Sequence, residues 1–419
     1  MTAPAEILLV ANNFPPVQGG SAVVYGALAR LAAPRVQVLA PRTSYVDGLP
    51  LIGWREHDRR AAAASDGRAG YRVERLDLLR TPIEGPAAGR WGRAGFLLHD
   101  LRIRADILRA VLRSLRTGRI AALCIGELVS SGWLFSVIRR MGPPHLRFVV
   151  YIHGEEITTR DDYDADWSRR RRTLAAADAI IVVSRFTATT VRDLLAGQAA
   201  PPIHLIENGV DFARFSAASH RPDLIAQYGL AGRFVFVSVC RLLEKKGIDY
   251  AIRAFARLAR ADADVRFLVV GSGPYAETLY AIAAAEGVAD RVVFTGSVAE
   301  ADLADHYSLG DVFVMPNRAL ASGDTEGFGL VFLEANAAGL PVIAGRDGGS
   351  VDAVKDGVNG LIVDGGSIDA IEAAMRRLRD DPSLRAEIAA GGIACAAAAD
   401  WEVKAQQFVV ACLGRSDGD

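Results

Sequence analysis

The sequence has few cysteines and no long apolar run. Its 419 residues include four cysteines, at positions 124, 240, 395 and 412, and no C-x-x-C pair. This spacing excludes a disulfide-dense scaffold and indicates buried thiols in a reducing compartment. No stretch approaches the roughly 18 to 20 apolar residues that a membrane-spanning helix needs, and no basic segment precedes an apolar run at the N-terminus. We therefore expect a cytoplasmic protein that touches a membrane from one side at most.

The sequence also lacks net charge and is poor in lysine. The 48 basic side chains nearly balance the 49 acidic ones, which argues against a global binder of nucleic acid. Residues 1–210 contain 28 arginines, no lysine and 20 acids, a balance of +8, whereas residues 211–419 contain 16 arginines, four lysines and 29 acids, a balance of −9. The opposite charges of the two halves predict two parts with different tasks.

Short apolar runs alternate with helix-periodic segments along the whole chain, which is typical of parallel α/β layers. In the first half we expect strands at residues 7–11, 36–39, 121–125, 148–153, 179–184 and 203–207. In the second half we expect them at residues 234–239, 266–270, 292–295, 312–315, 341–344 and 360–363. Residues 43–93, which are rich in Gly, Arg and Pro, predict long loops.

The length predicts two domains, because a single core rarely exceeds roughly 250 to 300 residues. A strand followed by the turn N-G-V-D at residues 208–211 marks the boundary. We therefore predict two doubly wound, Rossmann-like parallel-sheet domains at residues 1–211 and 212–399. Residues 400–419 are expected to form a C-terminal helix that crosses back to the first domain.

One motif in the second half combines two glutamates with a glycine-rich turn. Glu326 and Glu334 stand eight positions apart in D-T-E-G-F-G-L-V-F-L-E-A, residues 324–335. Backbone N–H groups at a helix start that follows such a turn suit a phosphate. The spacing predicts Glu334 about two turns into that helix, where its carboxylate suits a ribose, while Glu326 suits the hydroxyls of a sugar. A helix with an ordinary acidic first turn is the alternative.

A second motif gathers positive charge after an expected strand. The turn C-R-L-L-E-K-K-G at residues 240–247 holds Arg241, Lys246 and half of all the lysines. Open α/β sheets bind ligands at the carboxyl ends of their strands, and converging cations fit a diphosphate that gains charge as a bond breaks. A solvated loop is the alternative.

In this order the motifs resemble the retaining glycosyltransferases of family 4, which have the GT-B fold. The segments that carry the resemblance are R-L-L-E-K-K-G, G-S-G-P at 271–274, F-T-G at 294–296, the E-x7-E pair, E-A-N-A-A-G-L-P-V-I-A-G at 334–345 and G-V-N-G-L-I-V at 357–363. E-G-F-G-L-V-F-L-E-A and the G-G-S at 348–350 are most similar to the phosphatidylinositol mannosyltransferase branch. The resemblance implies that the two Rossmann-like domains face a central cleft.

The resemblance also implies a GDP- or UDP-linked sugar as the donor, held mainly by the second domain. Arg241 and Lys246 would neutralise its diphosphate, Glu334 would bind the ribose and Glu326 would orient the sugar. Further donor-binding residues implied are Gly273, Val298, Phe328, Gly329, Leu330 and Val331. Since no residue stands out as a covalent nucleophile, we expect front-face transfer with retention, without a metal or another cofactor.

In the first domain the resemblance is weaker. Gly19 and Gly20 follow the first expected strand and precede a helix, so their N–H groups could meet the same diphosphate. His153, in Y-I-H-G-E-E, ends another strand and would position the sugar without taking a proton. Residues 90–119 hold eight arginines among regularly spaced apolar side chains. Such a helix either lies on an anionic membrane that carries a lipid-linked acceptor or packs on the sheet.

Other functions remain open. G-S-G-P-Y-A at 271–276 formally matches a dinucleotide motif, but Asp290 precedes the next strand, whereas a ribose-binding acid follows it. The overlapping D-x-D triplets from Asp162 to Asp166 would suit a metal-dependent transferase, although a helix start explains them equally. A sugar-nucleotide epimerase, a phosphorylase and a non-catalytic nucleotide-binding module are the remaining alternatives. The sequence leaves the acceptor, which is a lipid-linked, glycan or small-molecule hydroxyl, and the oligomeric state undetermined.

Overall fold

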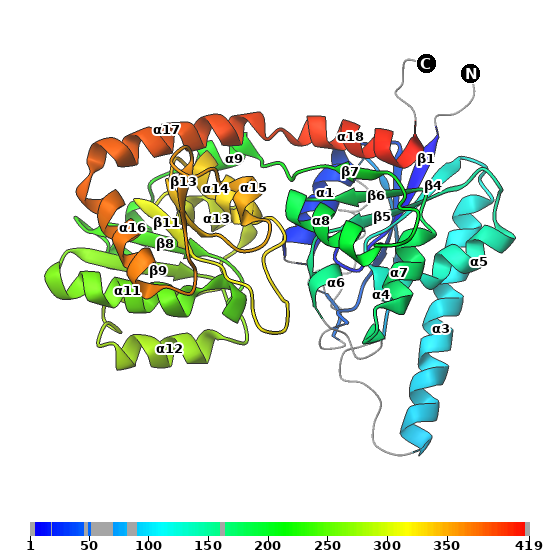
Figure 1. Ribbon diagram of the computed structural model, residues 1–419, viewed down its shortest axis with the longest axis horizontal. Helices are drawn as coiled ribbons and strands as arrows, with labels where there is room; N and C mark the ends of the chain where they lie inside the picture. The colour runs from blue at the N-terminus through cyan, green and yellow to red at the C-terminus, as the bar shows by residue number, and fades with distance from the viewer. Residues whose placement is uncertain are drawn as a thin grey trace. The chain divides into compact units, whose positions relative to one another are not determined.

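The computed structural model describes residues 5–17, 19–45, 49–51, 70–81, 90–159 and 164–414. The chain divides into two compact units (Figure 1). The first unit comprises Met1–Val183, Ala188–Ile206 and Trp401–Asp419, and the second comprises Ser184–Thr187 and Glu207–Asp400. Each unit is built on one parallel sheet, which confirms the predicted fold class of two Rossmann-like parts.

The first sheet has seven strands in the order β3-β2-β1-β4-β5-β6-β7. Their bounds are β1 Glu6–Val10, β2 Val36–Pro41, β3 Arg72–Leu76, β4 Ile120–Ile125, β5 Arg147–Ile152, β6 Ala179–Val182 and β7 Ile203–Leu205. All neighbouring strands pair in parallel, with Leu9 opposite Val38 on one side and Cys124 on the other. The strand order reverses at β1, so ligands are expected where the strands around it end.

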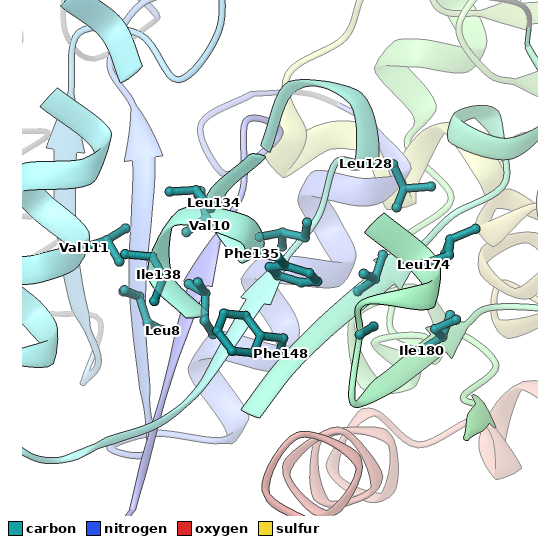
Figure 2. Packing of buried hydrophobic residues seen from close by; sticks show 14 of the residues in the cluster. Leu8, Val10, Val111, Leu128, Leu134, Phe135, Ile138, Phe148, Leu174 and Ile180 are labelled. Carbon is teal, nitrogen blue, oxygen red and sulfur yellow. The ribbon is translucent and has the colours of Figure 1, made fainter. Parts of the chain in front are cut away.

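Helices cover both faces of this sheet (Figure 1). They are α1 Gly20–Leu31, α3 Arg90–Leu115, α4 Leu128–Ser131, α5 Trp133–Met141, α6 Glu155–Thr158, α7 Ser168–Ala175, α8 Arg185–Leu194 and α18 Trp401–Leu413. Val111 of α3 and Ile138 of α5 pack with Leu8 and Phe148 in the core (Figure 2). On α18, Phe408 is fully buried, and the carbonyl of Cys412 accepts a hydrogen bond of 3.0 Å from Arg147 Nε.

The second sheet has six strands in the order β10-β9-β8-β11-β12-β13. Their bounds are β8 Phe234–Val239, β9 Val265–Val270, β10 Val292–Gly296, β11 Val312–Met315, β12 Val342–Gly345 and β13 Gly360–Val363. The accompanying helices are α9 Phe212–Ser216, α10 Pro222–Gln227, α11 Ile248–Ala261, α12 Ala276–Ala285, α13 Leu303–Tyr307, α14 Leu330–Ala337, α15 Ser350–Ala353, α16 Ile368–Asp380 and α17 Pro382–Ala398. The 3-10 turns η2 Glu244–Lys246 and η3 Glu300–Asp302 precede α11 and α13.

The expectation of loops throughout residues 43–93 is wrong, because strand β3 lies within them. Its sequence R-V-E-R-L is mostly charged, and its residues are exposed or half-buried. β3 pairs with β2 alone, at the edge of the sheet. An edge strand is commonly short and charged, so it lacks the apolar run by which buried strands are recognised.

Candidate functional site

The carboxyl edge of the second sheet brings together the residues predicted to bind the donor. Arg241 follows β8, Gly273 follows β9 and Val298 follows β10, while the loop after β11 leads through Glu326 to α14. Because neighbouring strands of this sheet are parallel, their carboxyl ends meet at one edge. Four separate segments of the sequence therefore contribute to one site.

Lys246 and Glu326 form a buried ion pair within this site. Lys246 Nζ donates to Glu326 Oε2 at 2.5 Å, and the two side chains are only 14% and 13% exposed. Burial disfavours both charges, but the pairing outweighs it, so the pKa of Lys246 is raised and that of Glu326 is lowered. The lysine therefore stays positively charged and the glutamate negatively charged.

A second buried ion pair runs beside the first. Lys245 Nζ donates to Asp324 Oδ1 at 2.7 Å, so adjacent lysines of η2 anchor two acids of the loop that precedes α14. The backbone N–H of Arg318 donates to the carbonyl of Lys245, which holds the start of that loop. Sequence reasoning missed the roles of Lys245 and Asp324; the matching order of the pairs, K-K against D-T-E, was the available signal.

Arg241 differs from both lysines. Its side chain is exposed, and it forms no ion pair with any residue that the structure describes. It still lies close enough to Lys246 to lower the pKa of that ammonium, although Glu326 prevails. The site thus presents one unpaired cation next to a neutralised pair, an arrangement that can receive an anionic ligand.

Glu334 is held by a buried tyrosine. Tyr307, at the end of α13, donates its hydroxyl to Glu334 Oε2 at 2.6 Å. Burial raises the pKa of Glu334, while the hydrogen bond from Tyr307 opposes that rise. The sequence analysis missed Tyr307 because it stands 27 residues before its partner in an ordinary apolar pattern.

The expected helical position of Glu334 is wrong in detail. Helix α14 begins at Leu330, so Glu334 is its fifth residue and lies just over one turn inside it. Glu326 lies before the helix, in the loop. The eight-residue spacing therefore does not place the two carboxylates on one helix face, and the loop that precedes α14 sets their relation.

Tight backbone packing fixes the glycine-rich turn. Gly329 has φ +90°, and a Cβ there would lie 2.5 Å from the ring of Phe332. Gly349 donates its N–H to the carbonyl of Glu326 at 2.8 Å, and a Cβ on Gly349 would lie 2.0 Å from the carbonyl of Gly327. Of the predicted donor-binding residues here, Phe328 and Leu330 are buried and Val331 is half-buried.

The turn around Gly273 packs against the strand end that carries Arg241. A Cβ on Gly273 would lie 2.4 Å from the carbonyl of Leu242, and the N–H of Leu242 donates to the carbonyl of Ser272 at 2.9 Å. The hydroxyls of Ser272 and Ser297 are 2.6 Å apart. The predicted Val298, which is half-buried, follows directly.

The remaining predicted residues lie in the first unit. Gly19 caps α1 with φ 144°, and Gly20 is the first residue of that helix. His153 follows β5, and burial lowers its pKa to about 3, so the imidazole is neutral at physiological pH. Its ring stacks on Tyr151, with centroids 4.9 Å apart, and its Nε2 is buried without a partner among the described residues.

The two rival motifs lie elsewhere in the fold. Asp290 precedes β10, so it does not lie at the carboxyl edge where an acid would meet a ribose. Asp162 lies outside the described residues. Asp164 is buried and accepts N–H groups of Arg169 and Arg170 at 2.8 and 3.0 Å near the start of α7. Its carboxylate therefore stabilises a helix start.

Comparison with known proteins places this architecture in a family. The model of Glycosyltransferase Family 4 matches residues 18–214, and that of Glycosyl transferases group 1 matches residues 221–394. The GDP-mannose-dependent alpha-(1-6)-phosphatidylinositol monomannoside mannosyltransferase of Mycolicibacterium smegmatis is 34% identical over 399 residues, 92% of each chain. The chain belongs to glycosyltransferase family 4. It is a glycosyltransferase, as its resemblance predicts.

Another relative of this family 4 glycosyltransferase is named for a different sugar. Alpha-D-kanosaminyltransferase of Streptomyces kanamyceticus is 28% identical and covers 77% of this chain and 84% of its own. Among solved structures, HepE of Anabaena in complex with UDP and glucose superposes with a TM-score of 0.71 at 22% identity, covering 97% and 98% of the two chains. Sucrose-phosphate synthase of Thermosynechococcus elongatus superposes with a TM-score of 0.73 at 22% sequence identity, and the match covers 97% of each chain. These likenesses confirm the fold.

Proposed function

We propose that this glycosyltransferase transfers mannose from GDP-mannose to a hydroxyl of a phosphatidylinositol lipid, with retention of configuration and without a metal ion. The observation that carries the proposal is at the carboxyl edge of the second sheet, where Arg241, unpaired among the described residues, lies beside the Lys246–Glu326 pair. Cations converging there suit a diphosphate leaving group. The M. smegmatis relative is named as a GDP-mannose-dependent phosphatidylinositol monomannoside mannosyltransferase, which supports mannose as the sugar and an inositol lipid as the acceptor.

In the proposed step, the bond between the anomeric carbon and the diphosphate oxygen breaks while the acceptor oxygen bonds to the same face of that carbon. The acceptor proton passes to the departing diphosphate. Arg241 and Lys246 stabilise the charge that grows on this leaving group, and Glu326 orients the sugar hydroxyls. Glu326 also keeps Lys246 in place, since the two are paired at 2.5 Å.

The other predicted residues have supporting roles in the proposal. Gly273 and Val298 line the binding site of the nucleotide base, and Glu334 binds the ribose. The backbone of residues 328–331 contacts the phosphate or the sugar. For Gly19 and Gly20, in the first unit, we propose that the N–H groups bind a phosphate group. His153 positions the sugar, and its low pKa supports a role in which it takes no proton.

A donor panel tests the proposal. GDP-mannose should raise the melting temperature more than UDP-glucose, UDP-galactose or ADP-glucose, because a ligand stabilises the fold that binds it. Incubation of GDP-mannose with phosphatidylinositol vesicles should yield GDP and a mannosylated lipid, with the same rate in EDTA. Absence of transfer from every donor, or activity lost in EDTA and restored by Mn²⁺, would contradict the proposal.

Tyr307→Phe should weaken donor binding through the ribose alone. The variant removes the 2.6 Å hydrogen bond that orients Glu334, so the KM for GDP-mannose should rise about 5- to 10-fold, the scale of one hydrogen bond, with kcat little changed. The loss should be smaller with a deoxyribose donor, because the hydroxyl that Glu334 binds is then absent. Tyr280→Phe, at an exposed tyrosine of α12, is the control. Equal losses with both donors would contradict a role through the ribose.

Helix α3 supports peripheral attachment to a membrane. No helix among the described residues is long and apolar enough to cross a bilayer. The second half of α3 packs on the sheet through Ile103, Ile107 and Val111, whereas its first half extends past the strands (Figure 1). There Leu97, Leu98 and Leu101 are 61%, 68% and 61% exposed. The second half of α3 thus packs on the sheet, and we propose that the exposed first half lies on an anionic membrane.

Replacing Leu97, Leu98 and Leu101 together with glutamine should reduce co-sedimentation with anionic vesicles at least about fivefold, because three exposed apolar side chains no longer enter the interface. Arg109→Gln is the matched control, since Arg109 is engaged with Asp106 at 2.7 Å on the same helix. Turnover of GDP-mannose without vesicles should be unchanged. Equal sedimentation of the triple variant and the native chain would rule out this surface.

Glu156 should make stability depend on pH. Burial raises the pKa of its carboxyl group from 4.5 to about 7, although hydrogen bonds from the backbone N–H groups of residues 156 and 154 lower that pKa. As pH rises from about 4.5 to about 7, the unfolded chain releases this proton first, so the free energy of unfolding falls. Denaturant titrations at pH 5 and pH 8 measure this fall in the free energy of unfolding. Glu156→Gln should make the difference between the two pH values smaller. Glu155→Gln, at an exposed neighbour, should leave the difference unchanged. An unchanged slope in Glu156→Gln would refute the assignment.

A further inference from the structure

Polar side chains from three strands meet at the carboxyl edge of the first sheet. Asn12 follows β1, Arg80 follows β3, and Glu127 follows β4 one residue before α4. Together with Ser130 of α4 they form a connected group, here named the Glu127 network. None of its members takes part in the proposed binding of the donor.

One oxygen of Glu127 receives all the donors of the network. Oε2 accepts from Asn12 Nδ2 at 2.9 Å and from Ser130 Oγ at 2.7 Å, and Arg80 Nη1 lies 3.7 Å from it. No donor from the described residues contacts Oε1. The carboxylate is therefore fixed in orientation, with its second oxygen available, and its side chain is 15% exposed.

Asn12 supplies an independent sign of a missing partner. The residue is 3% exposed, and its Oδ1 is buried without a hydrogen-bond partner in the described part of the chain. A buried carbonyl oxygen without a donor is costly, and native proteins rarely keep one without a reason. The amide cannot be turned to relieve it, because its Nδ2 is engaged with Glu127.

The two oxygens without a hydrogen-bond partner define which ligand fits. Asn12 Oδ1 and Glu127 Oε1 are both acceptors, so the ligand must donate hydrogen bonds to them. A phosphate, which presents only acceptor oxygens in its dianionic form, is repelled. The charge of Glu127 is balanced by Arg80, whose guanidinium also lies 4.7 Å from the ring centre of Tyr45. A cation is therefore favoured less than a neutral group.

We propose that the Glu127 network binds vicinal hydroxyls of a neutral polyol ring in the acceptor, a cyclitol or a sugar. The inference rests on the proposed transferase function and deepens it, because it assigns the acceptor residues. Glu127 and Asn12 bind the hydroxyls next to the one that is glycosylated, and Ser130 and Arg80 position the carboxylate. The phosphate of a lipid acceptor lies outside this network.

The test compares Glu127→Gln with Asp193→Asn, which changes an exposed carboxylate of α8. With GDP-mannose and phosphatidylinositol vesicles, Glu127→Gln should raise the acceptor KM about 10- to 100-fold, the scale of a hydrogen bond to a charged group. The donor KM, the melting temperature and the slow hydrolysis of donor without acceptor should not change. Ser130→Ala, which keeps the carboxylate, should raise the acceptor KM by a smaller factor and serves if Glu127→Gln does not fold.

Acceptors that lack one ring hydroxyl complete a double-mutant cycle. Removal of the hydroxyl bound by Glu127 should raise the acceptor KM of the native enzyme. The same removal should not raise the acceptor KM of Glu127→Gln further. An unchanged acceptor KM in Glu127→Gln would overturn the assignment. A lower KM of the native enzyme for an acceptor with an ammonium group in place of that hydroxyl would also overturn it. Failure of the native enzyme to bind or hydrolyse any nucleotide sugar would instead reject the proposed function.

Discussion

Replacing Arg241 with alanine should lower kcat/KM for transfer about 10²- to 10³-fold, the usual loss when one preorganised group that stabilises developing charge is removed. Arg241 is exposed and forms no ion pair with a described residue, so the native fold does not depend on its charge. A diphosphate gains negative charge as its bond to the sugar breaks, and we propose that Arg241, which has no ion-pair partner in the described part of the chain, stabilises that charge.

Steady-state kinetics and melting curves of Arg241→Ala provide the measurement. The melting temperature without ligand should match that of the native chain, and the stabilisation by GDP should shrink. Arg241→Lys should recover part of kcat, because lysine keeps the positive charge. The recovery should be incomplete, because an ammonium group lacks the planar guanidinium that binds two oxygens at once. Arg260→Ala, at a largely exposed arginine 3.5 Å from Glu286, is the control for loss of surface charge. A kcat/KM within threefold of the native value would show that the diphosphate binds elsewhere.

Lys246→Met should abolish transfer and also destabilise the second unit. The variant leaves Glu326 buried without Lys246, its closest counter-charge. Breaking a buried pair by removing one partner costs about 3 to 5 kcal/mol of unfolding free energy. Lys246→Met should thus lose stability and catalysis together, which Arg241→Ala should not.

The double variant separates these two effects. In Lys246→Met/Glu326→Gln the unpaired buried carboxylate is gone, so most of the lost unfolding free energy should return. Transfer should not return, because the double variant lacks both the cation proposed for the diphosphate and the carboxylate proposed for the sugar. Denaturant titrations and single-turnover assays on the single and double variants give both quantities. A double variant no more stable than Lys246→Met would show that the pair is not the source of the destabilisation.

The buried strands were predictable from sequence because their residues form nearly continuous apolar runs, as in F-V-F-V-S-V of β8. Strand β3 was not, since an edge strand needs no such run. Helix α3 was predicted, but its division into a packed and an exposed half depends on how far the sheet extends, which no local pattern encodes.

Candidate residues for the proposed donor site could be read from the sequence where they stand together in motifs, as Arg241 and Lys246 do. The contacts that orient them could not, because they join distant parts of the chain. Tyr307 meets Glu334 across 27 residues, and Asn12 meets Glu127 across 115. Neither Asn12 nor Glu127 belongs to a motif, and only the folded sheet brings their strand ends together.

The anomeric configuration of the product distinguishes transfer with retention from transfer with inversion. The native enzyme is incubated with GDP-mannose, an α-linked donor, and phosphatidylinositol in EDTA, and the one-bond coupling between carbon and proton at the new anomeric centre is measured by NMR. Metal-independent transfer with retention predicts an α-mannoside of the inositol ring, formed at the same rate as without EDTA. A β-mannoside, or no mannosylated product, would contradict it.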